Sequence, residues 1–230
     1  MRGTLKIEFL FCLIATFVGG FFIFGASEVR AANVSSGADG NWSSPSTWAS
    51  TVRTGTITYV IDSPEIVGTG TAFLTELAVG SIITSASGRG NISVVVASIT
   101  DDTHLTVTTN AGLTSSGAKS FSSRNVPTAS DDVTIANGDA VVVDTDVSCA
   151  SLKFPTGNSA SSSLDINAGT LTVSGTVTIP RAASPAFNIM SVNGGSLMTS
   201  GLAFTNAGTP SAKRHQLIIA NGVVAVSGDV

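Results

Sequence analysis

The chain has 230 residues, of which 11 are Lys or Arg and 15 are Asp or Glu, so its formal net charge is −4. This acidic balance argues against nucleic acid and against an anionic membrane surface as partners, because both are bound by clustered Lys and Arg. At this length the chain can bury a substantial core.

The first 31 residues predict an export signal. Arg2 and Lys6 form a short basic region, an apolar run covers residues 9–25, and Val29-Arg30-Ala31 places small residues where a leader peptidase requires them. We expect a signal peptide at 1–31, with cleavage after Ala31 or, alternatively, one residue later. The apolar run is short for a bilayer span of about 20 residues. A retained anchor is the alternative.

Removal of this leader changes the composition in two ways. It takes away three basic and two acidic residues, so the mature net charge is about −5. It also leaves Cys149 as the single cysteine, which excludes an intrachain disulfide and favours a small buried side chain at that position. The predicted location is secreted, extracellular or at the cell surface, with no membrane contact after cleavage.

The mature part is predicted to be all-β. Apolar and polar residues alternate in many windows, and no window keeps apolar residues at helical spacing. Three segments of the C-terminal half align without gaps, namely 164–175, 190–201 and 217–228, and a looser fourth copy begins at residue 133. The turn glycines of the four copies are Gly138, Gly169, Gly195 and Gly222, at spacings of 31, 26 and 27 residues.

A unit this short cannot bury its apolar face alone, so the repeats predict a solenoid in which each coil stacks on its neighbour. About 26 residues, mostly in strands, suit one three-sided coil of a right-handed parallel β-helix, whose rungs we assign to 123–230. The alternative is an antiparallel sandwich with hairpins at the glycines. The last repeat reaches the end of the sequence without a polar cap, so we expect further coils in a longer protein, or pairing of that end with a partner.

Two segments far apart in the sequence form one motif. Gly40-Asn41-Trp42 and Trp48 lie in the first segment, and Asp131-Asp132-Val133 lies in the second. Together they resemble the N-terminal region of secreted or cell-surface β-helix proteins of bacteria, in which this Gly-Asn-Trp…Trp…Asp-Asp-Val pattern opens the solenoid. The resemblance implies that residues 32–52 cap the β-helix and that Trp48 and Val126 are neighbours in space.

Residues 53–122 separate the two parts of that motif. They contain Val67-Gly68-Thr69-Gly70, Val79-Gly80-Ser81-Ile82 and Asp101-Asp102-Thr103-His104, together with several alternating segments. In this pattern they resemble a small β-barrel module of phage tail proteins and bacterial surface proteins. We therefore expect an inserted small β-barrel domain that projects sideways from the β-helix, because insertions are tolerated at exposed loops of a host fold.

Two groups of residues are candidates for binding. Trp42 and Trp48 are candidate ligand-binding residues that would stack on sugar rings; the alternative is that they cap the solenoid core where the first coil has no neighbour. Carboxylates that could hold calcium form the second group, with turn and strand hydrogen bonding as their alternative role. These carboxylates are Asp131, Asp132, Asp139 and Asp144.

No catalytic residue is predicted. His104 and His215 lie in different predicted modules, without the ligand spacing of a metal site. Asp131 and Asp132 are adjacent in a predicted strand and face opposite sides, so they cannot share a proton as a catalytic pair would. We expect that this region is not an enzyme and that it has no cofactor; bound calcium is the alternative.

The expected function is that of a secreted or cell-surface structural or adhesive β-helix protein, with surface glycans or other extracellular proteins as partners. One alternative is a carbohydrate-binding or carbohydrate-processing β-helix whose site lies beyond residue 230. A second alternative is a subunit of an extracellular filament, joined end to end through its solenoid.

Overall fold

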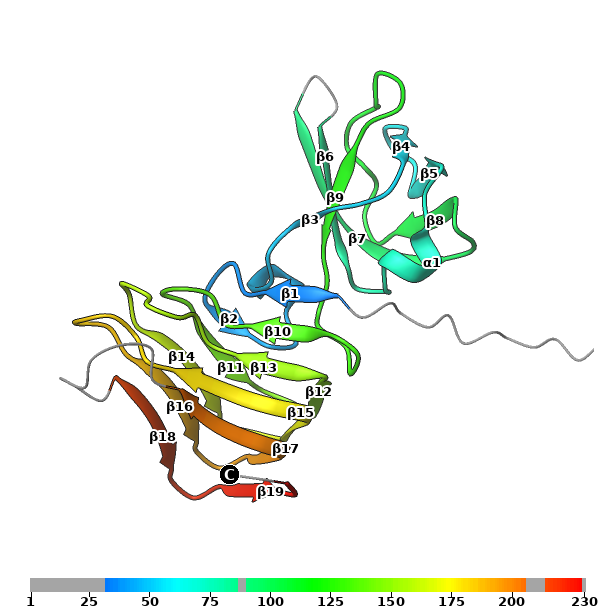
Figure 1. The fold of residues 1–230 in the computed structure, drawn as a ribbon. Helices are drawn as coiled ribbons and strands as arrows, with labels where there is room; N and C mark the ends of the chain where they lie inside the picture. The colour runs from blue at the N-terminus through cyan, green and yellow to red at the C-terminus, as the bar shows by residue number, and fades with distance from the viewer. Residues whose placement is uncertain (1–31, 87–89, 206–213, 229–230) are drawn as a thin grey trace, which may run out of the picture.

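The computed structural model describes residues 32–86, 90–205 and 214–228 (Figure 1). The predicted export signal at 1–31 lies outside the described residues. The described chain is all-β, as predicted, and its helical structure is confined to the 3-10 turn η1, Pro45–Thr47, and the short helix α1, Phe73–Glu76. Within those same ranges no helix has the length and apolar character needed to cross a bilayer.

Two parallel sheets form a β-solenoid of about three turns, which confirms the predicted solenoid. The strands of the larger sheet are β1 Asn33–Ser35, β10 Asp132–Thr134, β12 Val147–Cys149, β13 Ser151–Lys153, β15 Thr170–Pro180, β17 Ser196–Thr205 and β19 Val223–Val226. The strands of the smaller sheet are β2 Gly40–Asn41, β11 Ala140–Val143, β14 Ser162–Ile166, β16 Asn188–Val192 and β18 His215–Ile219. All of these pairs are parallel, so the alternative of an antiparallel sandwich is wrong.

Each coil has three sides, because the long strands β15 and β17 each cover two of them. The first part of β15 pairs with β12 and its second part pairs with β13. The register between β15 and β17 shifts between Val173 and Thr176, where the strand turns from one side to the next. The smaller sheet supplies the remaining side.

Inward side chains stack in columns that run along the solenoid. One column contains Val141, Leu164, Met190 and Leu217, and another contains Val147, Leu171, Leu197 and Val224. Leu164, Ile166, Leu171 and Val173 are all buried, as their alternation predicts, whereas the intervening residues reach the surface. Cys149 occupies a place in the Val173 column and is buried, so it serves as a small apolar side chain.

Three of the four turn glycines, Gly169, Gly195 and Gly222, lie in one column. Ser196 N donates to Gly169 O at 2.9 Å, and Val223 N donates to Gly195 O at 3.2 Å, so the three corners lie on one another. Gly169 has a positive φ of 66°, as expected of a turn glycine. Gly195 is required for a different reason, since a Cβ there would lie 2.7 Å from Ile166 Cγ2 and 2.8 Å from Gly169 O.

Gly138 lies at another corner of its coil, so the predicted alignment of the looser fourth copy with the other three is wrong. Its segment contains β10, which pairs with β13 in the larger sheet, whereas β14 of the first good copy lies in the smaller sheet. A Cβ on Gly169 would meet the backbone of Thr145 and Asp146, which therefore occupy the next place in the column. The coil containing β10 to β12 is shorter, and this difference in length explains the misalignment.

Seven strands of the intervening segment form an antiparallel sheet. They are β3 Thr51–Val52, β4 Thr56–Tyr59, β5 Glu65–Thr69, β6 Ile82–Ala86, β7 Asn91–Ile99, β8 His104–Val107 and β9 Phe121–Arg124. The sheet therefore spans residues 51–124, two residues more at each end than the predicted 53–122. It has its own apolar cluster around Ile57, Phe73 and Phe121, separate from the solenoid core.

The chain leaves and re-enters the solenoid at neighbouring points. Strand β3 leads out and β9 leads back, and the two pair antiparallel, with Thr51 opposite Ser123. Trp48 is part of the solenoid core, and Val126 packs against that core. Figure 1 shows the antiparallel sheet beyond the β1 end of the stack, opposite β19, and not at its side as expected.

The alternation along β17 gives a direct test of this architecture. Leu197 is fully buried between coils, whereas the next residue, Met198, is 51% exposed. Leu197→Ala is expected to lower the free energy of unfolding by about 2–5 kcal/mol, because it opens a cavity in the column. Met198→Ala, the matched control, should change it by about 0.5 kcal/mol. Urea denaturation of both variants measures the difference, and equal losses would contradict the stacked core.

Candidate functional site

The two tryptophans form a buried pair at the N-terminal end of the solenoid core. Trp42 is 0% and Trp48 is 1% exposed, and their rings meet edge to face with centroids 4.9 Å apart. Trp48 Nε1 donates to the carbonyl of Trp42 at 2.9 Å, while Trp42 Nε1 is buried without a hydrogen-bond partner. The rings have no free face, so they cap the core and are not a platform for a sugar.

The pair is held by the first coil. Trp42 follows β2, and its N–H donates to Val142 O at 2.7 Å, which continues the pairing of β2 with β11. Turn η1 then reverses the chain, and Trp48 forms an antiparallel bridge with Ser36 beyond β1. The sequence places both rings over the end of the columns, beyond which the described residues form no further coil.

The four candidate calcium ligands are dispersed. Asp132 accepts a hydrogen bond from Ser151 Oγ, and Asp139 accepts one from Ser36 Oγ at 2.6 Å. Asp144 accepts from the hydroxyl of Ser43 at 2.6 Å and from its N–H at 3.2 Å. Across the described part of the chain, no three His, Cys, Asp or Glu residues gather as a metal site would require. Each of these carboxylates ties one coil to another, and the calcium hypothesis is not supported.

The hydrogen bonds that Asp144 accepts favour its ionised form. Desolvation of the carboxyl opposes its ionisation, but the hydroxyl and N–H of Ser43, with a smaller contribution from Asn41, outweigh it and lower its pKa. The ionised form therefore links Ser43, two residues after β2, to Asp144, the residue that follows β11.

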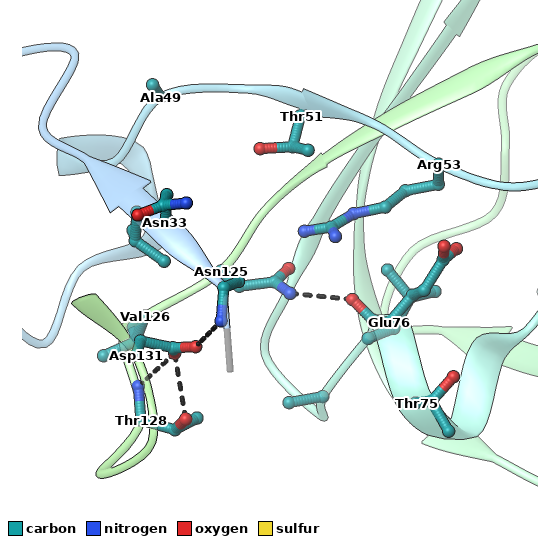
Figure 2. Close-up of a pocket in the computed structure, with 14 residues that line it drawn as sticks. Asn33, Ala49, Thr51, Arg53, Thr75, Glu76, Asn125, Val126, Thr128 and Asp131 are labelled. Atoms are coloured by element: carbon teal, nitrogen blue, oxygen red, sulfur yellow. Dashed lines mark hydrogen bonds between the residues drawn. The ribbon is translucent and has the colours of Figure 1, made fainter. Parts of the chain in front are cut away.

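Asp131 is the most buried of the four, at 4% exposure. Its Oδ2 accepts from the N–H of Thr128 at 2.7 Å and from the Thr128 hydroxyl at 2.9 Å, and its Oδ1 accepts from Ala32 N at 2.9 Å. The Thr128 contacts are drawn in Figure 2. Asp131 thus fastens the segment returning from the antiparallel sheet to the start of β1.

The remaining reactive side chains do not form a constellation. Burial raises the pKa of the Cys149 thiol to about 12, so it stays protonated. His104 is the exposed first residue of β8, next to the 101–103 turn, and its Nδ1 is 3.1 Å from Asp101 Oδ1 and 3.0 Å from Thr103 Oγ1. His215 lies in β18, in the solenoid, far along the chain from that turn and in another sheet.

A cleft lies where the antiparallel sheet joins the solenoid, with a volume of about 100 Å³ (Figure 2). Its walls come from the start of β1, from the segment around β3, from α1 and from the returning segment after β9. The polar side chains in its lining are Asn33, Thr51, Arg53, Thr75, Glu76, Asn125, Thr128 and Asp131.

Arg53 is the cation of this cleft, and Figure 2 shows its guanidinium pointing into it. Its Nε donates to Ser123 Oγ at 2.7 Å. Desolvation lowers the pKa of Arg53, an effect that the charges of Glu76 and Asp131 partly offset. The carboxylate of Glu76 is held by Thr54, whose hydroxyl lies 2.6 Å from Oε1 and whose N–H lies 3.0 Å from Oε2.

Sequence reasoning missed this cleft. Arg53 and Glu76 carry no motif, and Asn125, whose Nδ2 donates to Glu76 O at 2.8 Å, lies 49 residues beyond Glu76. Only the return of the chain beside its own exit point brings them together. The one feature of the sequence that pointed to this cleft was the Asp131-Asp132 pair, which lies where the returning segment meets β1.

Comparison with known proteins adds no relative: no family model, curated protein or solved structure matches this chain.

Conservative substitutions of the two tryptophans should have unequal effects. Trp48→Phe leaves the buried carbonyl of Trp42 without its donor, whereas Trp42→Phe removes an N–H that has no partner. Both changes remove a similar volume. Trp48→Phe is therefore expected to cost about 1–3 kcal/mol more in unfolding free energy than Trp42→Phe. Chemical denaturation gives both values, and a larger loss for Trp42→Phe would refute the assigned roles.

Ser43→Ala should raise the pKa of Asp144 toward the ordinary value of an aspartate. Because the folded-state pKa is lowered, the stabilisation exists above the unfolded-state pKa and is lost as pH falls through the folded-state pKa. The variant should therefore lose stability relative to the parent at neutral pH and approach it in acid. Carboxyl chemical shifts and thermal midpoints measured against pH test this. Ser46→Ala is the control, since the Ser46 hydroxyl contacts Ser44 and not Asp144.

Proposed function

We propose that the chain is an exported structural or adhesive protein whose solenoid is a scaffold and whose antiparallel sheet is the unit displayed for binding. The leader-like residues 1–31 support export. The dispersed carboxylates and histidines of the described residues support a non-catalytic role for this region. The partners proposed are surface glycans or other extracellular proteins.

The observation that carries this proposal is the way the antiparallel sheet is attached. It has a separate apolar cluster and lies beyond the end of the stack, and its two connections to the solenoid are adjacent. Such a unit can contact a partner without disturbing the coils. Several of its apolar side chains are exposed and available to a partner; among them are Val52, Val60, Ile61, Leu74 and Val79.

Two finer features belong to the same proposal. The coil is right-handed, as almost all connections between parallel strands of one sheet are. The antiparallel sheet closes into a small barrel, and the reciprocal hydrogen bonds between Ile57 and Lys119, at 2.8 and 2.9 Å, support closure between β4 and the segment before β9. A closed barrel has no free sheet edge, which suits a unit exposed to solvent.

Replacement of residues 51–124 by a short Gly-Ser linker tests the division of roles. The exit and return points are adjacent, so the solenoid should still fold, with an unchanged β-sheet circular dichroism per residue. Binding of the exported chain to arrays of glycans and extracellular proteins is expected to fall at least tenfold in the linker variant. Cell fractionation should find both chains outside the cell.

Two results would refute the proposed function. The first is retention of the intact chain inside the cell with its leader uncleaved. The second is equal array binding by the intact chain and the linker variant, which would assign adhesion to the solenoid.

A further inference from the structure

The carboxylate of Asp131 is buried without a direct ion pair, although the charge of Arg53 acts on it from across the cleft. It is 4% exposed, and its three donors, the N–H and hydroxyl of Thr128 and the N–H of Ala32, are all neutral. No cationic group of the described residues lies within 4.0 Å of it. An ionised carboxylate in such a place is costly unless it is paired.

The N–H that donates to Asp131 Oδ1 belongs to the residue expected to begin the mature chain. Ala32 N lies 2.9 Å from Asp131 Oδ1, and Ala32 is the residue that follows the predicted cleavage point. Its own carbonyl accepts from Asp132 N at 2.9 Å, so Ala32 is already fixed at the start of the β1–β10 pair. Cleavage would therefore create a new amino group beside Asp131 without moving the backbone.

We propose that leader cleavage after Ala31 creates an ion pair between the α-amino group of Ala32 and the carboxylate of Asp131, which locks β1 onto β10 in the mature protein. This inference rests on the proposed export, because export supplies the cleavage. Hydrolysis of the Ala31–Ala32 bond adds one water and leaves a carboxylate on the leader and an ammonium on Ala32. The ammonium replaces a neutral amide donor, and charge-assisted hydrogen bonds are roughly twice as strong as neutral ones.

The surroundings suit this pair. Ala32 itself is exposed at the rim of the cleft, so the remaining hydrogens of the ammonium can face water. The other charged groups in the lining are Arg53 and Glu76, one of each sign. Asp131 also holds the Thr128 turn, so the pair would join the first residue of the mature chain to the segment returning from the antiparallel sheet.

The test uses the exported protein with its natural processing. The matched control carries one glycine inserted between Ala31 and Ala32, so that the same cleavage leaves the amino group one residue away from Asp131. The native N-terminus is expected to raise the thermal midpoint by about 2–6 °C over the control. In an Asp131→Asn background the difference between the two N-termini should fall below about 1 °C, because the charge partner is gone.

A second measurement does not depend on the folding of Asp131→Asn. Acylation of the α-amino group at neutral pH, followed by mass spectrometry, should be at least tenfold slower for the native N-terminus than for the glycine-extended one. Equal rates, equal midpoints or a difference that survives in Asp131→Asn would overturn the lock.

N-terminal sequencing separates this failure from failure of the proposed function. A mature chain that begins at Asn33 would remove the ion pair and leave export intact. A chain that keeps its leader would refute both, whereas a chain that begins at Ala32 with equal midpoints would refute the lock alone.

Discussion

The stacking of each coil on the next is the interaction on which this structure depends. An isolated coil is too thin to cover its own aliphatic side chains, and burial comes only from columns such as Leu164, Met190 and Leu217. The later coils have nearly equal lengths, since partner residues along β14, β16 and β18 are 26 and 27 positions apart. The same close approach leaves no space for a Cβ at Gly195. Corner glycines are therefore a consequence of stacking as much as of turn geometry.

Within the described residues the first coil has a neighbouring coil on one side only, and large side chains cover its other side. Trp42 and Trp48 close the columns with two rings instead of a further coil, and one indole N–H finds a carbonyl within the pair. This is also where the antiparallel sheet is inserted. Between β2 and β10 the chain leaves the solenoid through β3 and returns through β9, beside its own exit.

The sequence predicts the later coils well and the earlier ones poorly, for a physical reason. Residues 164–228 repeat in phase because their coils have similar lengths, so alternation and glycine spacing identify inward and outward faces directly. The coil containing Gly138 is shorter, and a glycine pattern alone cannot show which corner a turn occupies. The sequence pointed to the tryptophans and aspartates as candidate binding residues. It did not show that the tryptophans are buried or that the aspartates are dispersed over several coils. Arg53 and Glu76 meet only through the fold, and no local pattern could have joined them.

The two apolar clusters are separate, so the placement of the antiparallel sheet on the solenoid depends on its connecting segments and not on a shared core. The outgoing segment is fixed where Ala49 N donates to Ser35 O at 2.8 Å. The returning segment is fixed by Val126, which packs against the solenoid core, and by the Thr128 turn that Asp131 closes. Asp131 also contacts the first described residue of the chain. A single buried carboxylate thus joins the residue before β1 to the turn through which the chain returns from the antiparallel sheet.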